Sequence, residues 1–310
     1  MSATTRGRNG QPSNASAPPT RVAVLGCGYW GMNHVRVFSE LPDATLVAAC
    51  DTRANRLEEV SHRYPQVAVT RDVDEILRMD DVEAVVVATE AQTHHEIASK
   101  ALTAGKHVLV EKPLATTSAD AQHLIALSET VDRLLVVGHT FLYNPAVRKV
   151  KEQLSTAEFG QMYYVYARRT NLGPIRHDVN AVWDLASHDI SIFNYLIGDT
   201  PTWVSAVGAR VLRNGRVDVG FICLGYPDGT VGHAHVSWAD PNKVREVVVV
   251  GSDMRIVFND LDPLERVRVF FKGVRAEPAE EPTTFGEHHL HLRDGDILSP
   301  SVPVVEPLKS

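Results

Sequence analysis

Short apolar runs alternate with helical patterns over residues 21–138, and this alternation restricts the fold of the chain more than any other feature. Val-rich runs without polar interruptions are typical of strands that are covered on both faces, and a helix is the usual link between two parallel strands. The sequence therefore predicts a parallel sheet with crossover helices in a domain of residues 21–140. The expected strands are 21–25, 45–50, 67–69, 84–89, 107–111 and 134–138, and the expected helices are 30–40, 53–63, 72–79, 93–104 and 118–131.

The pattern changes after residue 140. Helical patterns at 145–155 and 181–197 accompany runs in which apolar and polar residues alternate, separated by turn sequences. Alternation with a period of two predicts antiparallel strands joined by short turns. We therefore predict an α/β fold in which residues 141–280 form an α+β domain with a large open, mostly antiparallel sheet. Residues 1–20 have the composition of a disordered tail, and residues 281–310 form a C-terminal segment.

Composition and charge exclude several classes of partner. The 31 basic and 38 acidic residues give a net charge of −7, so the positive field of a nucleic-acid-binding protein is missing. Apolar runs are all shorter than 18 residues, and we expect no membrane-spanning helix. The three cysteines are odd in number and widely spaced, which favours neither a disulfide framework nor a Cys-based zinc site. We expect a cytoplasmic protein that acts on a small molecule.

Three glycines, Gly26, Gly28 and Gly31, follow the first expected strand with the spacing GxGxxG. In that position the first permits a tight turn, the second lets a pyrophosphate approach the backbone, and the third allows close packing of a helix on the strand. Asp51 ends the second strand 20 residues after Gly31, where a carboxylate can accept hydrogen bonds from ribose hydroxyls. The sequence therefore predicts a Rossmann-type dinucleotide site.

The residues around Asp51 bear on the choice of cofactor. A carboxylate at this position repels the 2′-phosphate of NADP, so Asp51 favours NAD. Arg53 and Arg56 follow closely, and they leave NADP as an alternative. Both arginines are otherwise interpreted as solvated charges in the first turn of a helix.

Further segments resemble a known family: VAVLGCGYWGMNHVR, AVVVATEAQTHHEIA, GKHVLVEKPLA, GHTFLYNPAVR and WDLASHDI. Together they resemble the Gfo/Idh/MocA oxidoreductases, named for glucose-fructose oxidoreductase and inositol dehydrogenase, over residues 21–275. The Glu-Lys-Pro tripeptide and the DxxxHD helix are the most specific of these segments in combination. Within the family, the chain looks most similar to the branch of UDP-N-acetylglucosamine 3-dehydrogenases.

The resemblance implies hydride transfer between a secondary carbinol carbon of a sugar and a nicotinamide, with C3 of a UDP-linked N-acetylhexosamine as the expected substrate. It also implies that the second sheet forms a wall of the active site and often an oligomer interface, so we expect a homo-oligomer, a dimer or a tetramer. Lys112, Asp184 and His188 match the family's catalytic positions.

The residues themselves support these roles. Lys112 follows a parallel strand, at the sheet edge where ligands bind in open α/β sheets. Asp184 and His188 are four residues apart in a helical stretch, so we expect Asp184 to hydrogen-bond His188, to orient it and to stabilise its protonated form. In the expected mechanism His188 is the general base, and Lys112 stabilises the charge that develops on the substrate oxygen.

Other candidate residues lie in the loops that follow the expected strands. The cofactor is expected to contact Tyr29, Trp30, Arg53, Ala88, Thr89, His94, Glu111 and Lys112, in addition to the glycines and Asp51. The substrate is expected to contact Tyr143, Asn144, Arg169, Asn171, Arg176, Asp178 and His188. A helix cap before Pro145 is an equal interpretation of Asn144. Lys243 and Arg245 are interpreted as solvated strand charges, with contact to a phosphate or to a neighbouring subunit as alternatives.

Several other interpretations remain open at this stage. His288, His289 and His291 lack a carboxylate or cysteine partner at a recognisable spacing, which favours a strand over a metal site. The alternative functions are a dehydrogenase of another nucleotide sugar, a free sugar or a cyclitol, an NAD-dependent glycosidase without net redox change, and a non-catalytic NAD-binding protein. By the resemblance, residues 281–310 are shortened relative to the family, whose members continue into helices that return to the first domain.

Overall fold

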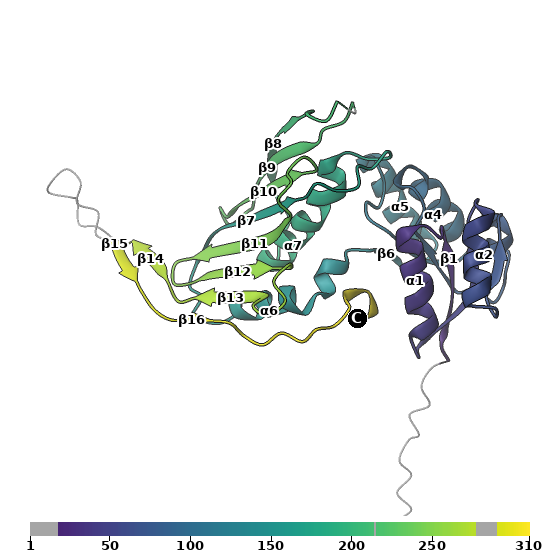
Figure 1. The fold of residues 1–310 in the computed structure, drawn as a ribbon, viewed down its shortest axis with the longest axis horizontal. Helices are drawn as coiled ribbons and strands as arrows, with labels where there is room; N and C mark the ends of the chain where they lie inside the picture. Colours follow the sequence, from purple (N-terminus) through teal and green to yellow (C-terminus); the bar gives the residue numbers. More distant parts are fainter. Residues whose placement is uncertain (1–17, 214, 277–289) are drawn as a thin grey trace, which may run out of the picture.

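The computed structural model describes residues 18–213, 215–276 and 290–310, and most of them belong to two sheets with their covering helices (Figure 1). The predicted α/β class, with one parallel and one mostly antiparallel sheet, is confirmed. Apart from residues 18–20, the expected tail lies outside the described residues. His288 and His289 also lie outside them, so the expectation of a strand at these histidines is untested there.

The first sheet has six parallel strands in the order β3-β2-β1-β4-β5-β6. Strand β1 is central, and the order of connection reverses between β1 and β4. In such sheets ligands bind where the order reverses, at the carboxyl ends of the strands. The strands are β1 (Thr20–Leu25), β2 (Ala44–Cys50), β3 (Ala68–Thr70), β4 (Ala84–Val87), β5 (His107–Val110) and β6 (Leu135–Val137).

Helices cover both faces of this sheet, which explains its continuous apolar strands. Leu25 and Val85 belong to one buried cluster, and their neighbours Val24 and Val86 belong to a second. Because successive side chains on a strand point to opposite faces, each strand contributes to both clusters. The helices are α1 (Tyr29–Glu40), α2 (Ala54–Arg63), α3 (Val73–Leu77), α4 (His94–Thr103) and α5 (Ser118–Thr130).

The second sheet has eight strands in the order β16-β13-β12-β11-β7-β10-β9-β8. All neighbouring pairs are antiparallel except β10 and β7. A separate two-stranded sheet pairs β14 (Gly273–Ala276) with β15 (Leu290–Arg293). The eight strands are β7 (Met162–Thr170), β8 (Trp203–Ala209), β9 (Val219–Gly225), β10 (Val231–Ser237), β11 (Val244–Gly251), β12 (Arg255–Asn259), β13 (Val267–Phe270) and β16 (Ile297–Leu298).

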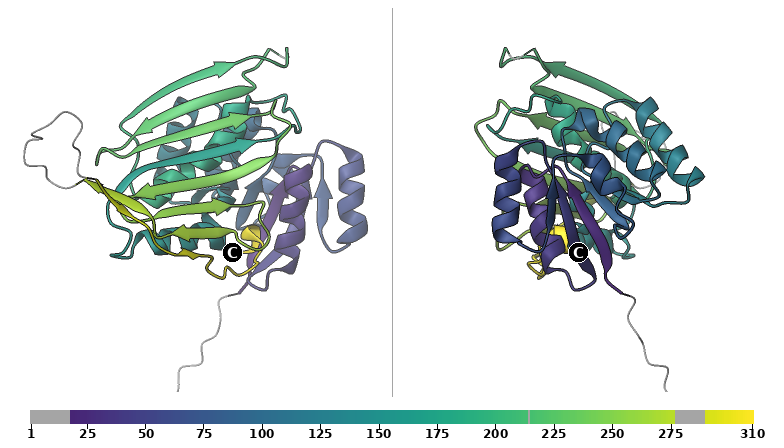
Figure 2. Two further views of the ribbon diagram at one scale, coloured as in Figure 1. Left: turned by 60° about the vertical axis from the view of Figure 1, so that its left-hand side comes forward. Right: turned by 90° about the vertical axis from the view of Figure 1, so that its right-hand side faces the viewer.

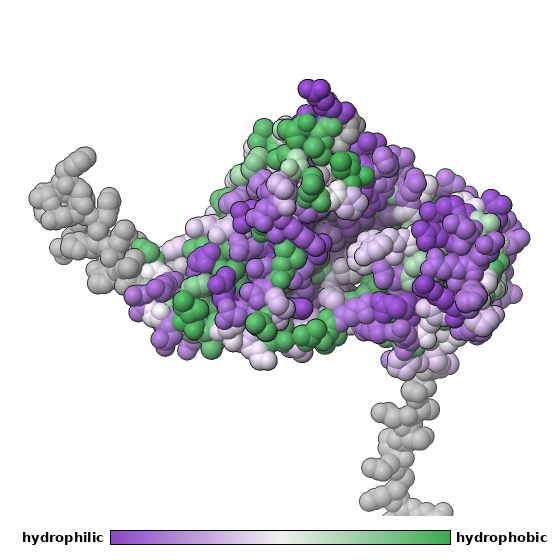
Figure 3. Space-filling view, viewed as in Figure 1, coloured by the Kyte–Doolittle hydropathy of each residue, from purple (hydrophilic) through white to green (hydrophobic). Residues whose placement is uncertain are grey.

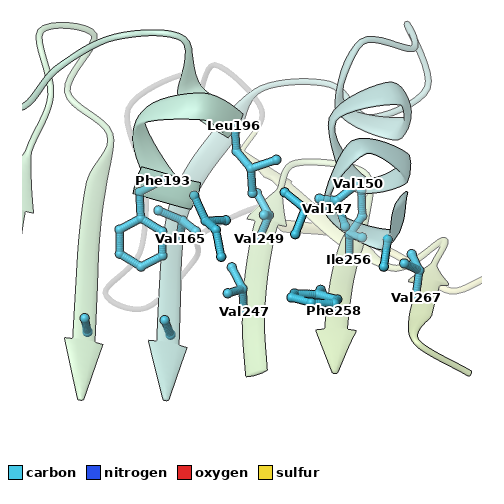
Figure 4. Close-up of a cluster of buried hydrophobic side chains, with 14 of the residues drawn as sticks. Val147, Val150, Val165, Phe193, Leu196, Val247, Val249, Ile256, Phe258 and Val267 are labelled. Atoms are coloured by element: carbon cyan, nitrogen blue, oxygen red, sulfur yellow. The ribbon is translucent and has the colours of Figure 1, made fainter. Parts of the chain in front are cut away.

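Two helices, α6 (Pro145–Leu154) and α7 (Ser187–Ile197), cover one face of the second sheet. Figure 4 shows Phe193 and Leu196 of α7 beside Val165 of β7, and Val147 of α6 beside Ile256 of β12. Within the described part of the chain, no helix covers the opposite face of this sheet (Figure 2, left). We call the covered face the inner face and the other the outer face.

The last described residues run back toward the first domain (Figure 1). Strand β16 pairs with β13, and a short 3-10 helix, η4 (Pro307–Lys309), contacts both α1 and η2 (Thr140–Tyr143). The carboxylate of Glu306 accepts hydrogen bonds from the Arg36 guanidinium, and Lys309 pairs with Glu40. The C-terminal segment therefore links the second sheet to α1.

The packing of α7 on the sheet can be tested at Phe193, which is fully buried among the residues of Figure 4. Phe193→Ala should reduce the free energy of unfolding by about 3–5 kcal/mol, because it leaves a cavity in a closely packed core. Ile125→Ala, at a half-exposed position of α5, should change it by less than about 1 kcal/mol. Urea unfolding measures both, and equal small losses would contradict this packing.

Candidate active site

The glycine-rich turn between β1 and α1 has the geometry that the sequence predicts for a dinucleotide loop. Gly26 has a φ of +93°, a backbone conformation that residues other than glycine rarely adopt. A Cβ at Gly31 would lie 1.7 Å from the carbonyl oxygen of Gly26, so helix α1 packs on the turn too closely for any side chain. A Cβ at Gly28 would meet only the Arg53 guanidinium, at 3.8 Å. Gly28 is therefore open on the side where a pyrophosphate would approach.

Asp51 lies beside this turn and is fully engaged in hydrogen bonds. Its Oδ2 accepts from the Cys27 amide at 2.7 Å and its Oδ1 from the Arg53 amide at 2.9 Å, and the Arg53 guanidinium donates to both oxygens at 2.9 Å. Burial raises the pKa of Asp51, but these hydrogen bonds outweigh it and the pKa is lowered. Arg53 thus pairs with the carboxylate expected to bind ribose, while its side chain remains 54% exposed to solvent. Arg56 instead pairs with Glu59.

The loops after β4 and β5 lie next to the turn. A Cβ at Gly26 would touch the backbone of Ala88 and Thr89, which places both residues against the dinucleotide loop. His94 is buried, and its ring nitrogens lie 2.7 Å from the Pro113 carbonyl and 3.2 Å from the Thr89 carbonyl. The expectation that His94 contacts the cofactor directly is corrected here, because its ring fixes these two loops to each other.

Glu111 connects the end of β5 to helix α1. It is buried, and its Oε1 lies 2.8 Å from Nε2 of His34. Its Oε2 accepts from the Lys112 amide at 3.3 Å. The Glu111 side chain therefore holds the backbone amide of Lys112 in place. His34 was not among the sequence candidates, since a histidine inside an amphipathic helix gives no distinct signal.

Tyr29 and Trp30 lie in the first turn of α1, with rings 5.7 Å apart in an edge-to-face arrangement. Tyr29 is 81% exposed and Trp30 40% exposed. Both large apolar side chains flank the mouth of the glycine-rich turn. Their role in cofactor binding stays a prediction.

Lys112 crosses from the first domain to the second. Its ammonium donates to the Asp184 carbonyl at 2.8 Å and to the Asp184 carboxylate at 2.9 Å. Burial lowers the pKa of Lys112, and the Asp184 carboxylate partly offsets this. Lys112 and Asp184 thus form a direct, largely buried ion pair, a contact that the sequence did not predict.

The backbone around Asp184 is a π-helical turn (Val182–Ala186) that leads into α7. In an α-helix the Asp184 carbonyl would accept from the His188 amide, but a π-helical register changes that pairing. The carbonyl oxygen is thus able to accept from Lys112. Asp184 also accepts from the Trp238 indole at 3.3 Å, a contact that the sequence did not suggest because Trp238 alternates like a packed strand residue.

The expected hydrogen bond between Asp184 and His188 is wrong. The hydrogen bonds of the Asp184 carboxylate go to Lys112, Arg176 and Trp238. Nδ1 of His188 is buried and has no hydrogen-bond partner among the described residues. The π-helical turn explains the difference, because the expectation assumed a regular α-helix from Asp184 to His188.

The expected stabilisation of protonated His188 by Asp184 is also missing, because no hydrogen bond joins the two side chains among the described residues. Burial lowers the pKa of His188 well below its ordinary value, and the nearby charges of Lys112 and Arg169 lower it further. The imidazole is therefore neutral at pH 7. Phe141 packs edge-on against it with ring centroids 5.0 Å apart, and His139 lies close enough to lower its pKa as well.

Two of the expected substrate residues have structural partners instead. Arg169 is buried and forms a bidentate ion pair with the buried Asp189, with Nη2 to Oδ1 at 2.8 Å. Its guanidinium also lies 4.5 Å from the Phe141 ring centroid. Asn144 accepts from the Ala146 amide at 2.9 Å and caps α6, which confirms the alternative interpretation of this residue. The expectation that Arg169 and Asn144 bind substrate is corrected on these contacts.

Arg176 and Asp178 link the two domains. Asp178 accepts from the Ala91 amide of the first domain at 3.0 Å and from the Arg176 guanidinium at 2.8 Å. Arg176 reaches Asp184 at 3.4 Å as well. Both residues therefore lie at the boundary between the domains, and Asp178 joins one to the other. Their role in substrate contact stays a prediction. Tyr143 is 39% exposed beside Arg148, and Asn171 is half-buried at the end of β7.

No group of three or more His, Cys, Asp or Glu side chains in the described part of the chain could hold a metal ion. No described helix is long and apolar enough to span a membrane.

The glycines give a sharp test of the dinucleotide loop. Gly31→Ala should destabilise the protein even without cofactor, because the new Cβ would overlap the Gly26 carbonyl. Gly28→Ala should leave the unfolding free energy within about 1 kcal/mol of wild type, because its φ is −72° and the space is open, yet weaken NAD binding more than about tenfold. Thermal unfolding and a fluorescence titration with NADH measure these effects. Normal NADH affinity in Gly28→Ala would contradict the assignment.

Both halves of the chain match known families. Residues 20–139 match the oxidoreductase family with an NAD-binding Rossmann fold, and residues 147–257 match the GFO/IDH/MocA C-terminal domain. The chain is 30% identical over 236 residues to the scyllo-inositol 2-dehydrogenase (NAD(+)) of Bacillus subtilis, covering 71% of this chain and 68% of that protein. It is 29% identical over 220 residues to the UDP-N-acetylglucosamine 3-dehydrogenase of Acidithiobacillus ferrooxidans, covering 70% of this chain and 66% of that one.

The structure is similar to that of GenD2 from gentamicin A biosynthesis in complex with NAD, with a TM-score of 0.77, 25% identity, and coverage of 99% of this chain and 85% of that one. The chain spans between 59% and 66% of the length of several other curated relatives that it matches. The first match covers the six-stranded sheet, and the second covers α7 and the strands β7 to β11 of the second sheet. The chain therefore belongs to the Gfo/Idh/MocA family of oxidoreductases, and its first domain is an NAD-binding Rossmann domain.

Proposed function

We propose that this chain is an NAD-dependent dehydrogenase that oxidises a secondary hydroxyl of a sugar, with C3 of a UDP-linked N-acetylhexosamine as its substrate. One observation carries the proposal. The Lys112 ammonium is held at the carboxyl end of β5 by Asp184, beside a neutral imidazole at His188. A fixed cation next to a neutral base is what the removal of a hydroxyl proton requires.

The first domain fits NAD. The Gly28 position is open, and Asp51 lies next to the turn, where its Oδ2 accepts from the Cys27 amide. When bound, the nicotinamide would accept the hydride from the carbinol carbon. The Arg53 guanidinium must leave at least one Asp51 oxygen for a ribose hydroxyl to bind there, because it occupies both in this structure.

His188 serves as the general base in this proposal. Because its Nδ1 is buried, we assign Nε2 as the nitrogen that accepts the hydroxyl proton. Lys112 donates a hydrogen bond to the same substrate oxygen and stabilises its negative charge as the proton leaves. Two of the three Lys112 N–H groups are used by Asp184, which leaves one for the substrate.

Asp184 has a different role from the one expected from its spacing. It positions the Lys112 ammonium and does not contact the His188 imidazole. Trp238 and Arg176 donate to the same carboxylate, so Asp184 is itself held in place by groups from the second domain.

A cyclitol or free sugar is a second candidate substrate. It is favoured by the similarity to the scyllo-inositol 2-dehydrogenase of Bacillus subtilis. A panel of UDP-sugars, TDP-sugars, inositols and free hexosamines with NAD, followed at 340 nm, separates the two. Turnover of a UDP-N-acetylhexosamine supports the first proposal, and turnover of inositols alone supports the second.

The catalytic residues are tested by Lys112→Ala and His188→Asn. Each should lower kcat by about 10²- to 10⁴-fold, because each removes acid–base or charge stabilisation in the transition state. The Kd for NADH should stay within about threefold of wild type. His123→Asn, on the outward side of α5, is the control and should keep full activity. Undiminished turnover in either catalytic variant would refute its assignment.

We further propose that the outer face of the second sheet mediates assembly into a homo-oligomer. Figure 3 shows apolar side chains gathered over β8 and β9. By strand register these side chains point to the outer face together with neighbours on β7 and β10. We call this set the β8 patch, and its members, all between 40% and 67% exposed, are Tyr164, Trp203, Val207, Phe221 and Val231.

A soluble monomer rarely exposes an apolar patch of this kind. Val207→Glu should therefore convert the dimer or tetramer to a smaller species, because it places a charge within the β8 patch at its most exposed side chain. Light scattering after size exclusion measures the mass. The control is Glu158→Lys, on an exposed loop. A substitution at Ser205 would not serve as a control, because this residue also lies on the outer face. A wild-type monomer would contradict this part of the proposal.

A further inference from the structure

Arg245, beside the candidate site, is weakly paired compared with the other cations there. Arg245 of β11 is the register partner of Arg169 of β7, so both side chains start from the inner face of the second sheet. Arg169 is buried and held by Asp189 and Phe141. Among the described residues, Arg245 makes a single ion pair, with Asp260 at 3.3 Å, and its side chain remains 40% exposed.

The other cations of the site are more tightly paired. Lys112 makes two hydrogen bonds to Asp184, and Arg176 is bound by Asp178 and Asp184. Of the four cations considered, Arg245 has the weakest partner and the greatest exposure. The Asp260 carboxylate is also shared with the Asn144 amide at 3.3 Å. Arg245 is therefore the cation best able to exchange its partner for a ligand.

Arg245 also lies near the base by geometry, because it is the register partner of Arg169, which is paired with Asp189, the residue after His188. Burial is the main reason for the low pKa of His188, and the charge of Arg245 contributes to it, as it does to the pKa of the neighbouring Asp189. A cation at this place makes the imidazole a weaker proton acceptor, which opposes the role proposed for His188. An anion bound to the guanidinium would cancel this effect when substrate is present.

We propose that Arg245 binds an anionic group of the substrate, a carboxylate or a phosphate, on the His188 side of the cleft. The inference rests on the proposed function, because it assigns the substrate's charge within that site. A guanidinium suits this role because it presents paired donors that match either anion. It replaces the interpretation of Arg245 as a solvated strand charge. It also predicts that neutral free sugars and cyclitols bind poorly.

The test measures binding and not turnover, so that it is independent of the proposed chemistry. The enzyme is loaded with NADH, which cannot accept a hydride, and sugar ligands are titrated by calorimetry. Three ligands are compared: UDP-N-acetylglucosamine, its counterpart oxidised to the C6 carboxylate, and free N-acetylglucosamine. The variants are Arg245→Gln and Arg245→Lys. The matched control is Arg255→Gln, which removes an arginine from the outer face of the adjacent strand.

Arg245→Gln should weaken binding of at least one anionic ligand by about 10- to 100-fold and leave the NADH affinity and that of free N-acetylglucosamine unchanged. Equal losses for both nucleotide sugars would identify a phosphate as the partner, and a loss confined to the carboxylate-bearing ligand would identify the carboxylate. Arg245→Lys should restore part of the affinity, since it keeps the charge but not the paired donors. Arg255→Gln should behave as wild type.

Two results would overturn the inference. One is unchanged affinity of Arg245→Gln for both anionic ligands, and the other is failure of the wild type to bind either of them at millimolar concentration. The outcome is separable from that of the proposed function. If no ligand of the panel is oxidised but anion binding depends on Arg245, the dehydrogenase proposal fails and this inference stands. If UDP-N-acetylglucosamine is oxidised and Arg245→Gln has no effect on binding, only this inference fails.

Discussion

The buried ion pair between Lys112 and Asp184 is the interaction on which the rest of the site depends. It joins the end of β5 in the first domain to the π-helical turn before α7 in the second. Removing one partner would leave an uncompensated buried charge, which is costly in a protein interior. The pair therefore fixes the position of the ammonium and, through α7, its relation to His188. The link from Asp178 to the Ala91 amide lies at the same boundary between the domains.

The chemistry of the cleft follows from how its charges are paired. Lys112, Arg169 and Arg176 each have a carboxylate partner, and the half-buried His188 is neutral. A neutral base beside a restrained cation is suited to accepting a proton from a hydroxyl while the resulting charge is stabilised. Arg245 differs from these cations because its ion pair is weak. This difference is the basis for the proposal that Arg245 binds an anionic group of the substrate.

Much of the fold and part of the site could be predicted from the sequence. The parallel sheet follows from continuous apolar runs, and the tight packing of Gly31 on Gly26 follows from the glycine spacing. The partner of Asp184 could not be predicted, because i to i+4 spacing indicates contact only in a regular helix, and this turn is π-helical. Arg169 was assigned to substrate because nothing in its own strand reveals Asp189, which is 20 residues away on α7. Contacts of that kind are set by tertiary packing.

A double-mutant cycle on stability tests the central claim most directly. The free energy of unfolding is measured for Lys112→Met, Asp184→Asn and His188→Asn, singly and as the two pairs that contain Asp184→Asn. The account predicts a coupling energy above about 1 kcal/mol between Lys112 and Asp184, and less than about 0.5 kcal/mol between Asp184 and His188. Strong coupling of Asp184 to His188, with none to Lys112, would contradict it.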